Sequence, residues 1–183
     1  WLDRLQFLSA HVSLAHGVWL SEQDIGLVAQ RRSALVHNPS SNLRLKSGIA
    51  PLTLIRRAGI PLALGLDSST LNDDMDMLQE MRLSANLQRV PGVSAETVAL
   101  KDIFRMATVN GSHVLGWGEL SGTLEPGKRA DMVLLDGRRL AEPYLSSEHN
   151  PIHALLYRGR ASDVDTVMVD GESIGGKGPR MVR

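Results

Sequence analysis

Three short apolar runs, each ending at a polar side chain, constrain the fold of this chain most strongly. The runs and the side chains that follow them are 12–15 with His16, 34–36 with His37, and 59–66 with Asp67. Strands that alternate with helices need crossover connections, so these runs are predicted to be parallel strands of one sheet in an α/β protein. Because functional groups gather at the carboxyl ends of such strands, we expect the three side chains to line one edge.

Helical patterns separate the three predicted strands. Ser21 and Asp24 have the spacing of a capping box, which predicts a helix that ends near Arg32. A second helix is expected from about Pro51 to Gly59, and residues 37–48 before it are expected to form a loop.

The pattern changes from helical to β near residue 120. Before this point, three more helices are expected, over residues 74–89, 94–107 and 109–115. Then come a short strand near 122–124, a turn at 125–128, a strand at 130–135 and a hairpin over 165–174 that turns at Asp170-Gly171. The sequence therefore predicts two parts, residues 1–119 and a small β unit at residues 120–183.

The composition excludes several classes of protein. Twenty basic residues offset twenty acidic ones, which argues against a nucleic-acid or anionic-membrane partner and favours a small, nearly neutral substrate. Cysteine is absent, which excludes disulfides and thiolate metal sites and is compatible with the cytoplasm, the location we expect. No apolar run approaches the roughly 20 residues that span a bilayer. The start at Trp1 is typical of the middle of a fold, so we expect an N-terminal portion to precede it.

Asp67 and His16 are the main catalytic candidates. Burying a carboxylate is costly unless it is paired or coordinated, and the run before Asp67 is apolar enough to be buried on both faces. We therefore predict that Asp67 is a metal ligand, although a turn or capping role also suits its Asp-Ser-Ser-Thr context. His16 could bind a substrate carbonyl or orient a metal-bound water, or it could be a hydrogen-bonded structural residue.

The remaining polar clusters have more than one reading. His37 and Asn42 could contact a substrate, or they could hold the loop between them rigid. Asn72, Asp73, Asp74 and Asp76 resemble a metal cluster but are interpreted as a helix start, where acids offset the macrodipole. His149 and His153 have zinc-ligand spacing but are assigned surface or packing roles within the β unit.

Several motifs in order resemble the amidohydrolase superfamily, in particular its chlorohydrolase and aminohydrolase branch. These are LAHGVWL at 14–20, HNPSSNLRLKSGIAP at 37–51 and LGLD at 64–67, with further similarity at 72–82, 107–116 and 122–133. That branch includes triazine hydrolases, guanine deaminases and adenosyl-homocysteine deaminases. The resemblance implies a (β/α)8 TIM-barrel hydrolase acting on non-peptide C–N bonds, with one divalent ion, zinc or else iron.

The same resemblance implies roles for the candidates. The ion activates a water that displaces ammonia, an amine or chloride from a nitrogen heterocycle. Asp67 would bind the ion and move a proton from the water, while His16 would stabilise the attacked substrate or that water. Separately from the resemblance, we predict that His37 and Asn42 contact the substrate from the loop that they bracket.

Other parts of the family pattern are absent from this sequence: a His-x-His pair after the first strand, a His after the fifth and a Glu beyond it. The chain is therefore expected to supply strands six to eight of the barrel and the C-terminal part of an accessory β-sandwich. A complete barrel takes about 250 residues, and a catalytic metal normally has three protein ligands. We expect the missing N-terminal half as a partner, a homodimer for the complete enzyme, and no activity for the isolated chain.

Two other functions are compatible with the sequence. A truncated, non-catalytic α/β protein could act as an assembly partner, because three barrel strands leave two open sheet edges. A free-standing module could instead bind an anion at the loop 38–42.

Overall fold

A parallel three-stranded sheet forms from the first half of the chain. The computed structural model describes residues 1–68, 75–90, 92, 96–146 and 148–176. Strands β1 (Ser13–Ala15), β2 (Ala34–His37) and β3 (Leu62–Leu64) pair in the order β1-β2-β3. Leu35 is aligned with Leu14 on one side and with Leu62 on the other. The three strands, and their parallel arrangement, are as predicted.

The crossover helices follow the predicted signals with one exception. Helix α1 (Glu22–Gln30) has the predicted capping box, in which Ser21 accepts from the backbone of Asp24, and α3 (Leu52–Arg57) ends before Gly59. The prediction of a loop over 37–48 was wrong, because α2 (Pro39–Arg44) forms there. Proline at the first helical position suits the fixed φ of that residue, and burial of the next three residues outweighs their loop-like composition.

Three helices follow β3 in the described part of the chain. They are α5 (Met77–Leu87), α6 (Leu100–Met106) and α7 (Val109–Val114). Asp76 caps α5 by accepting from the backbone of Leu78 and Gln79, which confirms the helix-start reading for that acid. The other polar residues of that cluster, 72–74, lie outside the described residues, as does Ser94. Helix α6 begins later than predicted, since residues 96–99 are not helical.

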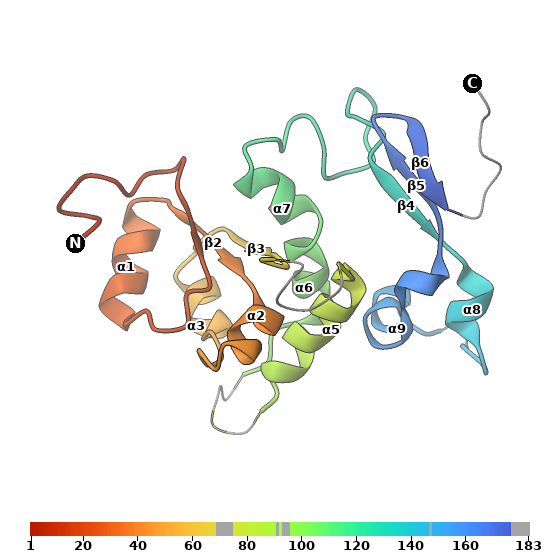
Figure 1. Cartoon of the computed structure of the whole chain (residues 1–183), viewed down its shortest axis with the longest axis horizontal. Helices are drawn as coiled ribbons and strands as arrows, with labels where there is room; N and C mark the ends of the chain where they lie inside the picture. Colours follow the sequence, from red (N-terminus) through yellow and green to blue (C-terminus); the bar gives the residue numbers. More distant parts are fainter. Residues whose placement is uncertain (69–74, 91, 93–95, 147, 177–183) are drawn as a thin grey trace.

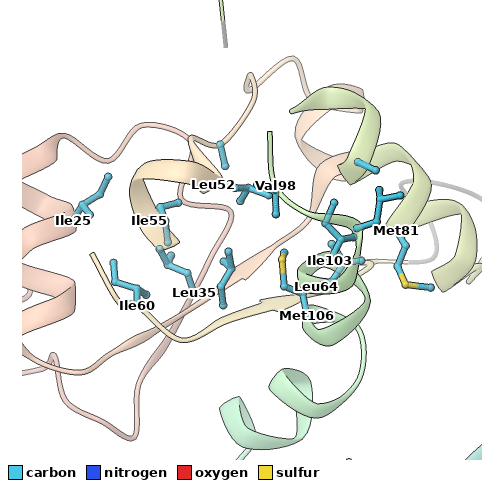
Figure 2. Packing of buried hydrophobic residues seen from close by; sticks show 14 of the residues in the cluster. Ile25, Leu35, Leu52, Ile55, Ile60, Leu64, Met81, Val98, Ile103 and Met106 are labelled. Carbon is cyan, nitrogen blue, oxygen red and sulfur yellow. The ribbon is translucent and has the colours of Figure 1, made fainter. Parts of the chain in front are cut away.

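One hydrophobic core joins the sheet to its helices. Figure 2 shows side chains from β2, β3, α1, α3, α5 and α6 gathered around it. Those labelled there are Ile25, Leu35, Leu52, Ile55, Ile60, Leu64, Met81, Val98, Ile103 and Met106. This packing holds the strands in place, and thereby positions the residues that follow their carboxyl ends.

The second sheet is antiparallel. It consists of β4 (Met132–Leu135), β5 (Val164–Val169) and β6 (Glu172–Gly176), and Figure 1 shows it on the other side of α5 and α6 from the first sheet. The hairpin between β5 and β6 is confirmed, with positive φ at both Asp170 and Gly171 as a type I′ turn needs. The strand predicted near 122–124 was wrong: the backbone bends there, and Gly122 has φ 100°.

Two helices and a 3-10 turn connect β4 to β5: α8 (Gly137–Ala141), α9 (Pro151–Arg158) and η1 (Ala161–Asp163). Helix α9 packs against α5 and α6 (Figure 1), and Leu156 on α9 is fully buried in the core cluster. Arg82 of α5 donates from Nε to the Leu156 carbonyl at 3.0 Å and from its guanidinium to the Gly159 carbonyl. The predicted domain boundary near residue 120 stays a prediction. Helix α9 lies after this boundary in the sequence but contacts helices of residues 1–119.

The structure corrects the placement of one histidine pair. His153 lies on α9 and His149 just before it, so neither belongs to a β element. Both are exposed, in line with the predicted surface role. In the described part of the chain, no helix is both long and apolar enough to cross a membrane.

Candidate active site

His16 and Asp67, which follow β1 and β3, come together at the carboxyl edge of the sheet. His16 Nε2 lies 3.8 Å from Asp67 Oδ2, although the two strands are separated by β2. The backbone N–H of His16 donates to Val36 at 2.8 Å, and that of Gly65 donates to His37 at 2.9 Å. These hydrogen bonds continue the parallel pairing past the strand ends, and they hold His16 and Gly65 against β2.

The backbone turns sharply at both candidates. His16 has φ 70° and Asp67 has φ 65°, in the left-handed region that residues with a Cβ seldom adopt. Such conformations carry strain and gather at functional sites, where the surrounding structure must hold them. An observed outlier at each of the two predicted catalytic residues therefore supports the hypothesis of function.

Gly65 allows the chain to approach β2 closely before it reaches Asp67. A Cβ at this position would lie 2.5 Å from Asn38 Oδ1 and 2.8 Å from the Val36 side chain, closer than real atoms come. The glycine in the motif LGLD thus has a steric reason. It lets the strand end pass over the end of β2 and brings Asp67 to the shared edge.

Helix α2 supplies one hydrogen bond to each candidate. Asn42 Oδ1 lies 2.8 Å from His16 Nδ1, and Ser41 Oγ donates to Asp67 Oδ2 at 2.6 Å. Asn42 was a predicted site residue, but Ser41 was not. Ser41 lies beside Asn42 in the polar motif, and only the helical conformation shows that both side chains face the candidate pair.

These hydrogen bonds determine which atoms of His16 and Asp67 remain available to a substrate or a water. An amide oxygen only accepts, so His16 carries its proton on Nδ1, and in the neutral ring Nε2 presents its lone pair. The separation of 3.8 Å between Nε2 and Asp67 Oδ2 is too long for a hydrogen bond. The His16 and Asp67 side chains are 40% and 32% exposed, so a small group placed beside them could contact both.

His37 lies behind this pair and is buried, with 1% exposure. Burial lowers the pKa of its imidazole to about 4, and the nearby His16 adds to the shift. Within the described residues neither ring nitrogen has a hydrogen-bond partner, and neither has Asn42 Nδ2. Direct substrate contact by His37 and Asn42 stays a prediction, and their burial favours a supporting role.

A metal centre needs more ligands than these residues provide. Among the described residues, no three His, Cys, Asp or Glu side chains are grouped so that they could hold a metal ion. Asp67 and His16 offer two donors, whereas a catalytic zinc site normally takes three from protein. The described part of the chain therefore does not fit a metal centre by itself.

A largely apolar pocket of about 440 Å³ lies beside His16. Its lining includes Val18, Trp19 and Leu20, which follow His16 in the chain, together with Leu35 and Ser47. Trp19 is 86% exposed and could offer a flat apolar face. Such a surface next to a polar pair suits a planar, weakly charged ligand.

Polar side chains gathered at the carboxyl edge of a parallel α/β sheet lie where enzymes of this architecture place their active sites. The chain belongs to the amidohydrolase family, whose profile matches residues 1–174. The predicted membership is thus confirmed.

Three similar proteins illustrate the relationship. The chain is 39% identical over 171 residues to the 5-methylthioadenosine/S-adenosylhomocysteine deaminase of Thermococcus onnurineus, covering 93% of this chain and 39% of that enzyme. A zinc-bound adenosine deaminase from Xanthomonas campestris superposes with a TM-score of 0.86 at 34% identity, over 94% of this chain and 38% of the other. For a zinc-complexed atrazine chlorohydrolase from Arthrobacter aurescens, the TM-score is 0.83 at 27% identity, over 96% of this chain and 38% of the chlorohydrolase. The chain thus spans about two fifths of the length of the relatives it matches.

Proposed function

We propose that this chain is the C-terminal part of a metal-dependent aminohydrolase. Strands β1 to β3 would be strands six to eight of its TIM barrel, and β4 to β6 would belong to its accessory β-sandwich. Three parallel strands joined by helices, and the superposition of 94% of the chain on 38% of a deaminase, support this placement. The barrel domain would include residues 1–119, and the β-sandwich domain would include residues 120–183. Helix α9 of the second range would pack against the barrel helices.

The complete enzyme would use water to displace ammonia, an amine or chloride from a nitrogen heterocycle. The observation that carries this proposal is the His16–Asp67 pair, held at the sheet edge by Asn42 and Ser41. Similar proteins described as deaminases and as a chlorohydrolase support the reaction class. The apolar pocket beside His16 suits an aromatic heterocycle.

Asp67 would accept a proton from the attacking water. The Ser41 hydroxyl binds Asp67 Oδ2 and so orients the carboxylate while leaving Oδ1 available to that water. His16, with its proton fixed on Nδ1 by Asn42, would present Nε2 to the substrate or to the water. Both roles depend on a geometry that α2 maintains.

The remainder of the enzyme would have to complete the site. Zinc in the similar deaminase and chlorohydrolase supports a divalent ion, zinc or else iron, with Asp67 as one ligand. Since the described residues offer too few donors, the other ligands would come from the N-terminal half of the fold. The isolated chain would then be inactive, and the complete enzyme is proposed to be a homodimer.

Asp67→Asn in the complete enzyme tests this function. The amide cannot take a proton from water, so the release of ammonia from adenine nucleosides, or of amine or chloride from triazines, should fall by about 100-fold or more. Elemental analysis should also show loss of the metal. As a control, His153→Gln changes an exposed histidine on α9 and should leave both measurements unchanged. Full metal content in the Asp67→Asn enzyme would contradict the ligand role.

A non-catalytic assembly partner is the second candidate. It is favoured by the two outer strands, since β1 and β3 each pair with β2 alone among the described strands. Joining the chain to the N-terminal half of a related deaminase distinguishes the two candidates. Recovery of metal and turnover supports the enzyme, and a stable assembly with neither supports the partner.

A further inference from the structure

Helix α5 carries a buried polar stripe where an apolar one would be expected. Glu80, Ser84 and Gln88 follow one another at four-residue spacing and therefore share one face of the helix. Their exposures are 0%, 0% and 1%. Buried polar side chains are costly unless they are hydrogen-bonded, so at least one member of this stripe is expected to have a specific task.

Glu80 makes two hydrogen bonds to a single residue of α2. Its Oε1 accepts from the backbone N–H and from the hydroxyl of Ser40, each at 2.9 Å. Ser40 is the second residue of α2, where backbone N–H groups have no partner inside the helix. Asn38, at the N-cap position, makes no side-chain capping bond. A carboxylate from another helix therefore caps α2, with the charge that a helix N-terminus favours.

The residues after Ser40 are those that hold the candidate catalytic pair. Ser41 binds Asp67 and Asn42 binds His16, so three consecutive residues of α2 contact Glu80, Asp67 and His16 in turn. Helix α2 has only six residues, and its first turn is the part that Glu80 anchors. A shift of that turn would move both hydrogen bonds to the pair together.

We propose that Glu80 is a positioning residue that sets the orientation of His16 and Asp67 through α2. It cannot touch a substrate, because it is fully buried. Describing its effect as catalytic rests on the function proposed above. The orientation itself is a property of the chain and can be measured without activity.

The test is the protonation pattern of the His16 ring, read by ¹⁵N NMR in the 183-residue chain. In the wild type, Nδ1 should carry the proton, because it faces the Asn42 oxygen. Glu80→Ala should release α2 and shift the ring towards a mixture of the two tautomers. Glu80→Gln keeps an oxygen acceptor and the side-chain volume, so it should restore most of the wild-type signal.

Two controls separate positioning from general loss of stability. Ser84→Ala removes a buried hydroxyl one turn along the same face, and this hydroxyl has no partner in the described part of the chain. Leu156→Ala destabilises the core next to α5 without touching α2. Neither should change the His16 tautomer.

If Glu80→Ala does not fold, as judged by circular dichroism, Ser40→Ala replaces it. This milder variant removes one of the two bonds to Glu80, and a partial shift of the His16 tautomer is expected. A folded Glu80→Ala or Ser40→Ala chain with the wild-type tautomer would overturn the proposal, as would an equal shift in Leu156→Ala. In the complete enzyme, Glu80→Ala should lower kcat by about 100-fold, the effect of a 1 Å misplacement, with KM little changed.

Discussion

His37 is a histidine that the fold holds in its neutral form. Burial, reinforced by His16, lowers its pKa from 6.5 to about 4. Between these values the unfolded chain binds more protons than the folded chain, so the free energy of unfolding falls as the pH falls through this window. One pKa unit corresponds to about 1.4 kcal/mol. The shift from 6.5 to about 4 therefore predicts a loss of about 3 kcal/mol once the pH reaches the folded-state value.

Urea unfolding at pH 7.5 and at pH 4.5 measures this loss. His37→Gln removes the titrating group and should lose less stability over the interval than the wild type. The exposed His153 provides the comparison, since His153→Gln should leave the wild-type pH dependence intact. Equal losses in the wild type and in His37→Gln would show that His37 is not held neutral.

At the level of single residues, the sequence identifies candidate catalytic residues better than it identifies the residues that hold them in position. Asp67 and His16 could be named in advance because each follows a strand of the sheet, and Asn42 because it lies in the polar motif after His37. Ser41 and Glu80 could not, because their importance lies in hydrogen bonds across 26 and 40 residues of sequence. A glutamate within a helix is usually a solvated residue, and only its burial shows that Glu80 is different.

Elements were predictable where local signals and tertiary packing agree. The capping box at Ser21 and the Asp-Gly turn at 170–171 each form as expected. Helix α2 was missed because its Pro, Ser and Asn composition is typical of a loop. Its first turn is buried and hydrogen-bonded to Glu80, a partner that the local sequence does not contain.

Helix α9 gives a test at this level. Its sequence lies among β elements, yet Leu156 is fully buried against helices of the first part. Leu156→Ala should lower the free energy of unfolding by about 2–5 kcal/mol, through lost burial and the cavity it leaves. Ile174→Ala, on the 66%-exposed Ile174 of β6, should change it by less than about 0.5 kcal/mol. Thermal or urea unfolding compares the two, and equal small effects would mean that α9 does not belong to the core in solution.

At the scale of the whole molecule, the parallel sheet has two edges that pair with no other strand among the described residues, and its hydrogen bonds show which backbone groups face outward at each edge. Val12 and His16 bond to β2, so the backbone groups of Ser13 and Ala15 point away from it. Likewise Pro61 and Gly65 bond to β2, which turns Leu62 to the other side. The Leu62 carbonyl already accepts from the Asn110 side chain at 3.1 Å. The β1 edge is therefore the better site for an added strand.

This asymmetry leads to a prediction about association. Unpaired strand edges recruit other strands, so the 183-residue chain should self-associate, and Ser13→Pro should reduce that association. Proline at Ser13 removes an N–H that points outward and leaves the bonds to β2 intact. Leu14→Pro removes an N–H that points towards β2 and should disrupt the sheet itself.

Sedimentation velocity and circular dichroism separate these effects. Ser13→Pro should keep the wild-type spectrum and sediment as a smaller species, whereas Leu14→Pro should lose structure. A wild-type chain that stays monomeric at high concentration would show that its edges are protected. If Ser13→Pro associates as strongly as the wild type, contacts other than the β1 edge must hold the copies together. The exposed side chain of Trp19 would then be the next to replace.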